Sequence, residues 1–339
     1  MSSIKVAVAT NSLGKSAAGH TIQRKLEAAK SHGFDGVEVA IECVNAHSET
    51  LTSIESREAR LRAAASDIYV KSSSLSLSLI ALNPFGAYDG LKDSKEVEAR
   101  LKEAELWCEL CHIMHIPIFQ VLNSLICLED KAKYYPLIEN RIQICTTLYP
   151  LDESKIDSEP AVIAANMRKL GLLALKYNLR VAYEAPSWGI HKDTWQHVQE
   201  ILDLVNLPNV GHCLDTFHIA SKEAGNPFNP ASPIQEGGVQ RLQRSLDELK
   251  CTVNPANIAY LQLSDATVVD LEQKEYLMRD LAQPALMTQS RNCRIYPCEE
   301  QYGGTLPVIQ VAKTIFDMGY NGWVSMEVFH TDMWNTRAS

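Results

Sequence analysis

The chain has 339 residues, of which 46% are hydrophobic and 22% charged, as is ordinary for a globular protein. Its net charge of −9 argues against a nucleic-acid partner, because nonspecific affinity for phosphates depends on clustered Lys and Arg. The nine cysteines are scattered and odd in number, which favours reduced buried thiols over a disulfide scaffold. No signal-peptide pattern and no apolar run of about 20 residues is visible, so we predict a cytoplasmic protein without a membrane partner.

Short apolar runs alternate with helical patterns along the chain. Each run is mostly apolar and follows a turn signal, which is typical of a buried parallel strand. We predict strands at residues 5–9, 36–40, 75–82, 118–122, 180–184, 210–215, 258–262 and 323–327. The third strand is expected to stop at Asn83–Pro84, because proline cannot donate to a strand ladder. Helices are predicted near residues 21–32, 54–65, 94–114, 160–177, 194–205, 239–250 and 307–318.

This alternation of strands and helices predicts an α/β fold, a (β/α)₈ TIM barrel that forms one domain over residues 1–339. The connections that follow strands are long, whereas those that follow helices are short. Irregular insertions are expected near residues 126–160, 225–238 and 265–305. Because active sites of this fold are built where the strands end, we place these insertions around the mouth of the barrel.

Four predicted strands end in oxygen donors, namely Glu184, Asp215, Gln262 and Glu327. Strand ends of a barrel share one mouth, so we expect these side chains to converge there. Three carboxylates and one amide oxygen suit a single divalent cation, Mg²⁺ or Mn²⁺, with Co²⁺ as an alternative. The competing interpretation is that each acid only caps the helix that follows it. Glu38 lies inside the second predicted strand, and two interpretations stay open: it is a further acid at the mouth, or it is a strand residue that pairs locally.

Stretches within residues 12–20, 183–195, 213–218 and 290–307 carry a family resemblance, most specifically Asp215-Thr216-Phe217 and the Ser290-Arg-x-x-Arg294 pattern. With them the chain resembles the xylose-isomerase-like TIM barrels, and among these the fungal 3-dehydroshikimate dehydratases of quinate catabolism. The resemblance implies one divalent cation and a hydro-lyase reaction that converts 3-dehydroshikimate to protocatechuate. It also implies a small, carboxylated cyclic substrate. The number of subunits stays open, with a homo-oligomer as one option.

The chain departs from the family pattern in the first half of the mouth. Asn83 stands where the family has Gln, and Gly86 where it has a bulkier residue. The second strand continues into Ala40-Ile-Glu42 in place of an aromatic residue and Glu-Asp. These differences lead us to expect a closer match at the metal site than in the contacts that select the substrate.

The implied reaction removes a proton beside a ketone and expels a β-hydroxyl. A neutral histidine is the natural base for such a step. His218, three residues after Asp215, is our first candidate, and His191, in the loop after Glu184, is the second, as a proton carrier or a substrate contact. Which of them is base and which is acid stays open.

A guanidinium group pairs bidentately with a carboxylate. We therefore predict that Arg294, together with Arg291, binds the substrate carboxylate, with Ser290 as a further hydrogen-bond partner. The alternative function is a metal-dependent sugar isomerase or epimerase, which would use the same four oxygen donors. The two arginines of the Ser290–Arg294 stretch favour a carboxylated substrate over a neutral sugar. A DNA-repair endonuclease on the same barrel is disfavoured, because it would need more histidines for a zinc cluster and a basic face. A catalytically silent barrel is disfavoured for another reason, namely that the four oxygen donors are all present.

Overall fold

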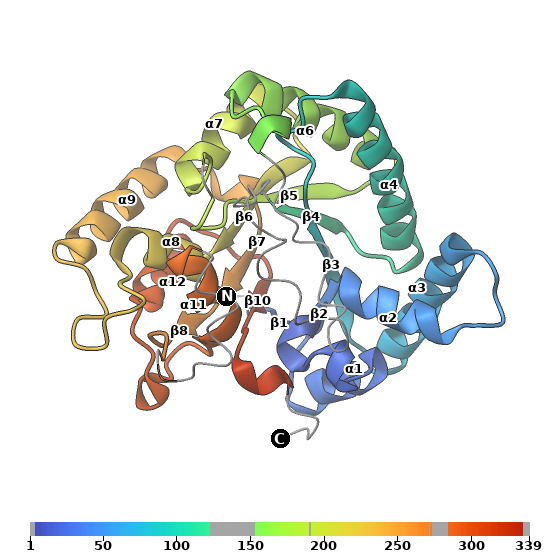
Figure 1. Ribbon diagram of the computed structural model, residues 1–339, viewed down its shortest axis with the longest axis horizontal. Helices are drawn as coiled ribbons and strands as arrows, with labels where there is room; N and C mark the ends of the chain where they lie inside the picture. The colour runs from blue at the N-terminus through green and yellow to red at the C-terminus, as the bar shows by residue number, and fades with distance from the viewer. Residues whose placement is uncertain (1–3, 123–152, 190, 271, 273–283, 335–339) are drawn as a thin grey trace.

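The computed structural model describes residues 4–122, 153–189, 191–270, 272 and 284–334. Eight parallel strands close into a barrel in the order β1-β10-β7-β6-β5-β4-β3-β2 (Figure 1), which confirms the predicted TIM barrel. The strands are β1 Val6–Ala9, β2 Gly36–Ala40, β3 Ser78–Phe85, β4 Ile118–Leu122, β5 Arg180–Glu184, β6 Val210–Asp215, β7 Ile258–Leu263 and β10 Val324–Met326.

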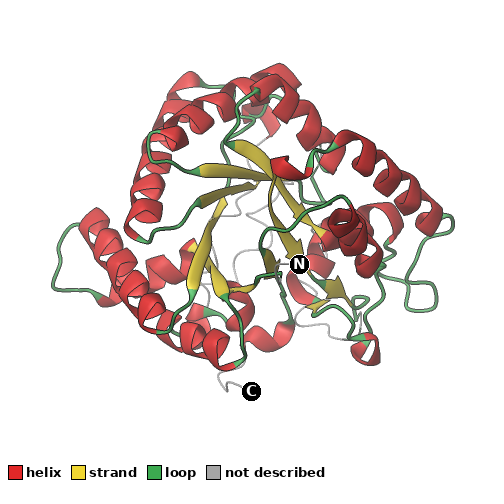
Figure 2. Cartoon of the chain, turned by 180° about the vertical axis from the view of Figure 1, so that it is seen from behind, coloured by secondary structure: helices red, strands yellow, loops and turns green. Residues whose placement is uncertain are grey.

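Helices surround the barrel on its outside (Figure 2). They are α1 Ile22–Ser31, α2 Ile41–Thr50, α3 Arg57–Ser74, α4 Ser94–Ile113, α6 Pro160–Leu175, α7 Trp195–Val205, α8 Thr216–Ala224, α9 Gly238–Thr252, α11 Ala285–Asn292 and α12 Val308–Asp317. Helix α1 shows how they form: the Thr21 side chain caps its first turn, and residues spaced three or four apart, such as Ile22, Leu26 and Ala29, are buried. In the described part of the chain, no helix combines the length and apolarity that crossing a bilayer requires.

The region before and within the third strand differs from the prediction. Helix α3 extends to Ser74, and Ser76, with a φ of 54°, turns the chain before β3 begins at Ser78. The strand then runs through Pro84 to Phe85 instead of stopping at Asn83. The register with β4 shifts between Leu82 and Phe85, and this irregularity accommodates the proline, which lacks an amide hydrogen.

Helices α2, α8 and α11 were not predicted. Helix α2 begins directly at the end of β2, where the apolar sequence continues, and α8 begins directly after Asp215 at the end of β6. The segment at 225–238 therefore follows α8 and leads to α9. Helix α11 lies within the region 265–305 and leads into Arg294, which pairs with β8 (Asp265–Ala266) in a short antiparallel ribbon. Most of the region 126–160 lies outside the described residues.

The closing seam of the barrel joins the first strand to the last. Val6 and Val8 of β1 pair with Val324 and Met326 of β10. Just after β1, the Ser12 hydroxyl accepts a hydrogen bond from the Val328 amide at 2.8 Å. The same hydroxyl donates to the Met326 carbonyl at 3.5 Å. These two contacts fix the backbone on both sides of Glu327.

Candidate active site

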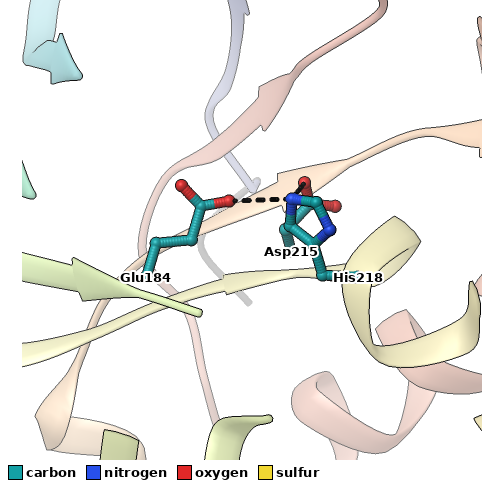
Figure 3. A group of neighbouring side chains, drawn as sticks. All are labelled: Glu184, Asp215 and His218. Carbon is teal, nitrogen blue, oxygen red and sulfur yellow. Dashed lines mark ion pairs between the residues drawn. The ribbon is translucent and has the colours of Figure 1, made fainter. Parts of the chain in front are cut away.

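Three buried side chains meet at the ends of β5 and β6. Donor atoms of Glu184, Asp215 and His218 all lie within 4.8 Å of one another. Figure 3 shows the two carboxylates and the imidazole gathered together: His218 Nε2 is 3.4 Å from Glu184 Oε1 and 3.5 Å from Asp215 Oδ2. Glu184 is the last residue of its strand, and His218 lies in the first turn of α8. This group could hold a metal ion.

Asp215 has two roles in this arrangement. Its Oδ1 accepts a hydrogen bond from the Phe217 amide at 2.7 Å and so caps helix α8. Its Oδ2 faces His218 and also accepts a hydrogen bond from Arg294 Nη1 at 2.7 Å. The capping interpretation therefore holds for Oδ1, while Oδ2 serves the other side chains of the group, so the cap does not exclude the predicted role of Asp215 as a metal ligand.

The Arg294 guanidinium lies among the acids and is only 1% exposed. Its Nη1 also donates to Glu327 Oε2 at 2.9 Å, and its Nε donates to Ser290 Oγ at 2.9 Å. Its Nη2 lies 3.0 Å from His218 Nε2. Arginine only donates hydrogen bonds, so this contact is a hydrogen bond in the tautomer that carries the imidazole lone pair on Nε2. The ring of Phe217 covers the guanidinium at 4.3 Å.

Gln262 is held by different partners. It pairs in register with Asp215, so the two side chains start at the same level of the barrel. Its Nε2 donates to Glu38 Oε1 at 2.9 Å, and its Oε1 accepts from the Cys213 thiol at 3.1 Å. The structure thus gathers Glu184, Asp215, His218, Glu327 and Arg294 into one network, with Gln262 beside it.

The remaining predicted residues lie at the margin of this network. Ser290 is buried and contacts Arg294, as described above, whereas Arg291 is half-buried in the last turn of α11. His191 is exposed, and within the described residues no hydrogen bond or ion pair joins it to the acids. Its role as a second proton carrier stays a prediction.

Sequence reasoning missed two supporting groups. Gln120 on β4 donates a hydrogen bond to Glu184 Oε2. The backbone amide and the hydroxyl of Ser187 both lie 3.2 Å from His218 Nδ1. The amide donates to Nδ1 in one tautomer of the neutral ring, and Arg294 donates to Nε2 in the other, in which the Ser187 hydroxyl can accept from Nδ1. For Gln120 a signal was present, because it is the polar residue within an otherwise apolar strand.

Burial dominates the electrostatics of the site. It raises the pKa of Glu184 to about 7, although Arg294 and Gln120 act in the opposite direction. It raises the pKa of Glu327 well above the ordinary value and lowers the pKa of His218 to about 3. His218 is therefore neutral at physiological pH. Burial opposes the charge of Arg294, but Asp215 and Glu327 outweigh it and raise the pKa of the guanidinium.

The donor set fits a divalent cation. Asp215 and Glu327 pair with the Arg294 guanidinium, and Glu184 lies against His218, so the ionised forms of the three acids carry more negative charge than Arg294 offsets. A buried charge is costly unless it is paired, and a cation would stabilise the ionised acids. Carboxylate and amide oxygens are ligands that Mg²⁺ and Mn²⁺ prefer.

A closed parallel barrel with metal-capable acids at its strand ends defines the class of this protein. Residues 26–339 match the family described as xylose isomerase-like TIM barrel, and the chain belongs to that family. Over 97% of its length it is 32% identical to a 3-dehydroshikimate dehydratase of Neurospora crassa, and it covers 87% of that protein. The chain therefore belongs to the family of the fungal 3-dehydroshikimate dehydratases, which confirms the predicted family and the predicted enzyme class, a lyase.

More distant relatives include a second dehydratase and solved structures with the same fold. A 3-dehydroshikimate dehydratase of Pseudomonas aeruginosa is 23% identical over 91% of this chain, which covers 36% of that longer protein. Among solved structures, the probable 3-DHS dehydratase AsbF from Bacillus anthracis has a TM-score of 0.58 at 14% identity, with 98% of this chain and 95% of that chain covered. An IOLI protein with a bound zinc atom has a TM-score of 0.64 at 16% identity, with 98% and 91% covered. These two structures support the fold.

Proposed function

We propose that this protein is a divalent-metal-dependent dehydratase that converts 3-dehydroshikimate to protocatechuate. The observation that carries the proposal is the 3.0 Å contact between Arg294 Nη2 and His218 Nε2. It sets a group suited to a carboxylate directly beside a neutral group suited to accept a proton. The relationship to the Neurospora crassa enzyme supplies the substrate.

In this proposal Glu184, Asp215, Gln262 and Glu327 hold one Mg²⁺ or Mn²⁺ ion. When bound, the cation supplies Lewis-acid polarisation of the ketone oxygen. Burial keeps the imidazole of His218 neutral, and in the tautomer with its lone pair on Nε2 this atom removes the proton beside the ketone.

The substrate carboxylate pairs with Arg294, which Ser290 holds through Nε. The β-hydroxyl leaves as water with a proton returned from His218 or delivered by His191. Tautomerisation of the resulting ring then gives the aromatic product. Two variants assign the proton carriers: if His218 is the base, His218→Asn lowers kcat by at least about 100-fold, whereas His191→Asn has the smaller effect.

The direct test is to incubate the purified protein with 3-dehydroshikimate and to follow the ultraviolet band of protocatechuate. We expect product with Mn²⁺ or Mg²⁺, loss of product with a chelator and recovery when the cation is returned. Absence of product under all these conditions would refute the proposal. Turnover of a ketose instead would support the alternative, a sugar isomerase or epimerase on the same barrel.

A further inference from the structure

Glu38 is a carboxylate buried inside the barrel, with 0% of its surface exposed. Its Oε1 accepts hydrogen bonds from Asn83 Nδ2 at 2.7 Å, Tyr260 OH at 2.6 Å and Gln262 Nε2 at 2.9 Å. These three donors come from β3 and β7, so one oxygen of β2 joins three strands. Such a convergence fixes the side chains that take part in it.

The bond to Gln262 determines which atom of its amide faces which way. The amide oxygen and the amide nitrogen have nearly the same size, so shape alone does not distinguish the two orientations. Oε1 of Glu38 accepts all three hydrogen bonds, and it stays an acceptor whether the acid is ionised or carries its proton on Oε2, so Glu38 requires the NH₂ group of Gln262 to face it. The carbonyl oxygen then points away from Glu38, where the Cys213 thiol donates to it at 3.1 Å.

Only the carbonyl oxygen of an amide can bind a cation. We propose that Glu38 is a positioning residue that presents the Gln262 carbonyl oxygen, and not its NH₂ group, to the divalent cation. This inference rests on the proposed function, because it requires Gln262 to be a ligand. Partners that orient metal ligands change metal affinity by about 10- to 100-fold when they are removed.

The experiment measures the affinity of the chelator-stripped full chain for Mn²⁺ by calorimetry, without substrate. Glu38→Ala removes the acceptor, and we expect about 10- to 100-fold weaker binding. Glu38→Asp keeps the charge but withdraws the carboxylate by one methylene group, so it should weaken binding in the same direction. It provides the test if the alanine variant does not fold.

Two controls separate positioning from a merely structural role. Tyr260→Phe removes a hydrogen bond of similar length to the same Glu38 oxygen but leaves the bond to Gln262. Glu38→Gln places a carbonyl oxygen where the three donors converge. We expect both variants to keep the Mn²⁺ affinity within about threefold of wild type, even if their melting temperature falls. Equal losses in Tyr260→Phe and Glu38→Ala would overturn the inference.

A rescue variant gives the sharpest result. The two oxygens of a carboxylate are equivalent, so a carboxylate at position 262 needs no orientation. Glu38→Ala/Gln262→Glu should therefore recover the affinity that Glu38→Ala loses, and no recovery would overturn the inference. Wild-type protein that fails to bind Mn²⁺ would refute the proposed function as well. Wild type that binds Mn²⁺ and forms product, with unchanged affinity in Glu38→Ala and Glu38→Asp, would refute this inference alone.

Discussion

Raising the pH should destabilise the metal-free protein. Burial raises the pKa of Glu38 and of Glu184 from 4.5 to about 7, and that of Glu327 well above its ordinary value. An acid with a raised pKa in the folded state binds its proton more tightly there than in the unfolded chain. Its contribution to stability is complete below about pH 4.5 and is lost as the pH rises through about 7.

The magnitude follows from these values. Between about pH 6.5 and about pH 8, a group with a folded pKa near 7 loses roughly 1 kcal/mol, so Glu38 and Glu184 together lose roughly 2 kcal/mol. Glu327 acts in the same direction. Burial lowers the pKa of His218 and of His212 to about 3, which opposes this trend, but only below about pH 6.5, where the unfolded imidazole is charged.

The assay is the melting temperature of the chelator-treated protein, measured by circular dichroism across this pH range. A loss of roughly 2 kcal/mol corresponds to about 3 °C for a chain of this length. Saturating Mn²⁺ should remove much of the slope, because it stabilises the ionised acids, and at 100 times its Kd it adds about 3 kcal/mol. A metal-free melting temperature that stays constant or rises across the window would refute the reasoning.

Three further variants test individual contacts. Glu327→Gln removes one negative charge from the site and should weaken Mn²⁺ binding at least about 10-fold in calorimetry; unchanged affinity would exclude Glu327 as a ligand. Arg294→Lys keeps the charge but not the fork that reaches Asp215, Ser290 and His218, so KM for the substrate should rise about 10-fold or more in steady-state kinetics. An unchanged KM would contradict the carboxylate assignment. Gly14→Ala would place a Cβ 2.5 Å from the His20 ring at a φ of 96°, so we expect at least about 2 kcal/mol of destabilisation in urea unfolding.

The barrel was predictable because buried parallel strands are short apolar runs. Strands β5 and β6 have the predicted bounds, since each begins after a turn and ends in an acid. The error before β3 arose because the alternation of Leu and Ser from Leu75 onward has the period of a strand, although Leu75 belongs to the end of a helix. Helix α2 was missed because no turn residue separates it from β2.

The site was predictable only in part. The rule that acids end strands found Glu184 and Asp215, which the structure brings together. It could not show that Arg294, 79 residues beyond Asp215 in the sequence, donates to it, because local patterns carry no information on such pairs. Nor could it decide whether Glu38 faces the mouth or a strand neighbour, since that depends on how three strands meet.

The seam held by Ser12 links the candidate cation site to closure of the barrel. The acids come from β2, β5, β6 and the segment after β10, and the backbone around Glu327 is held by β1 through Ser12 and by β7 through the Leu263 carbonyl. A chain that has assembled only the earlier strands would lack this ligand and bind the cation weakly. Cation affinity would thus report closure of the barrel, and the ion would selectively stabilise molecules in which β1 has paired with β10.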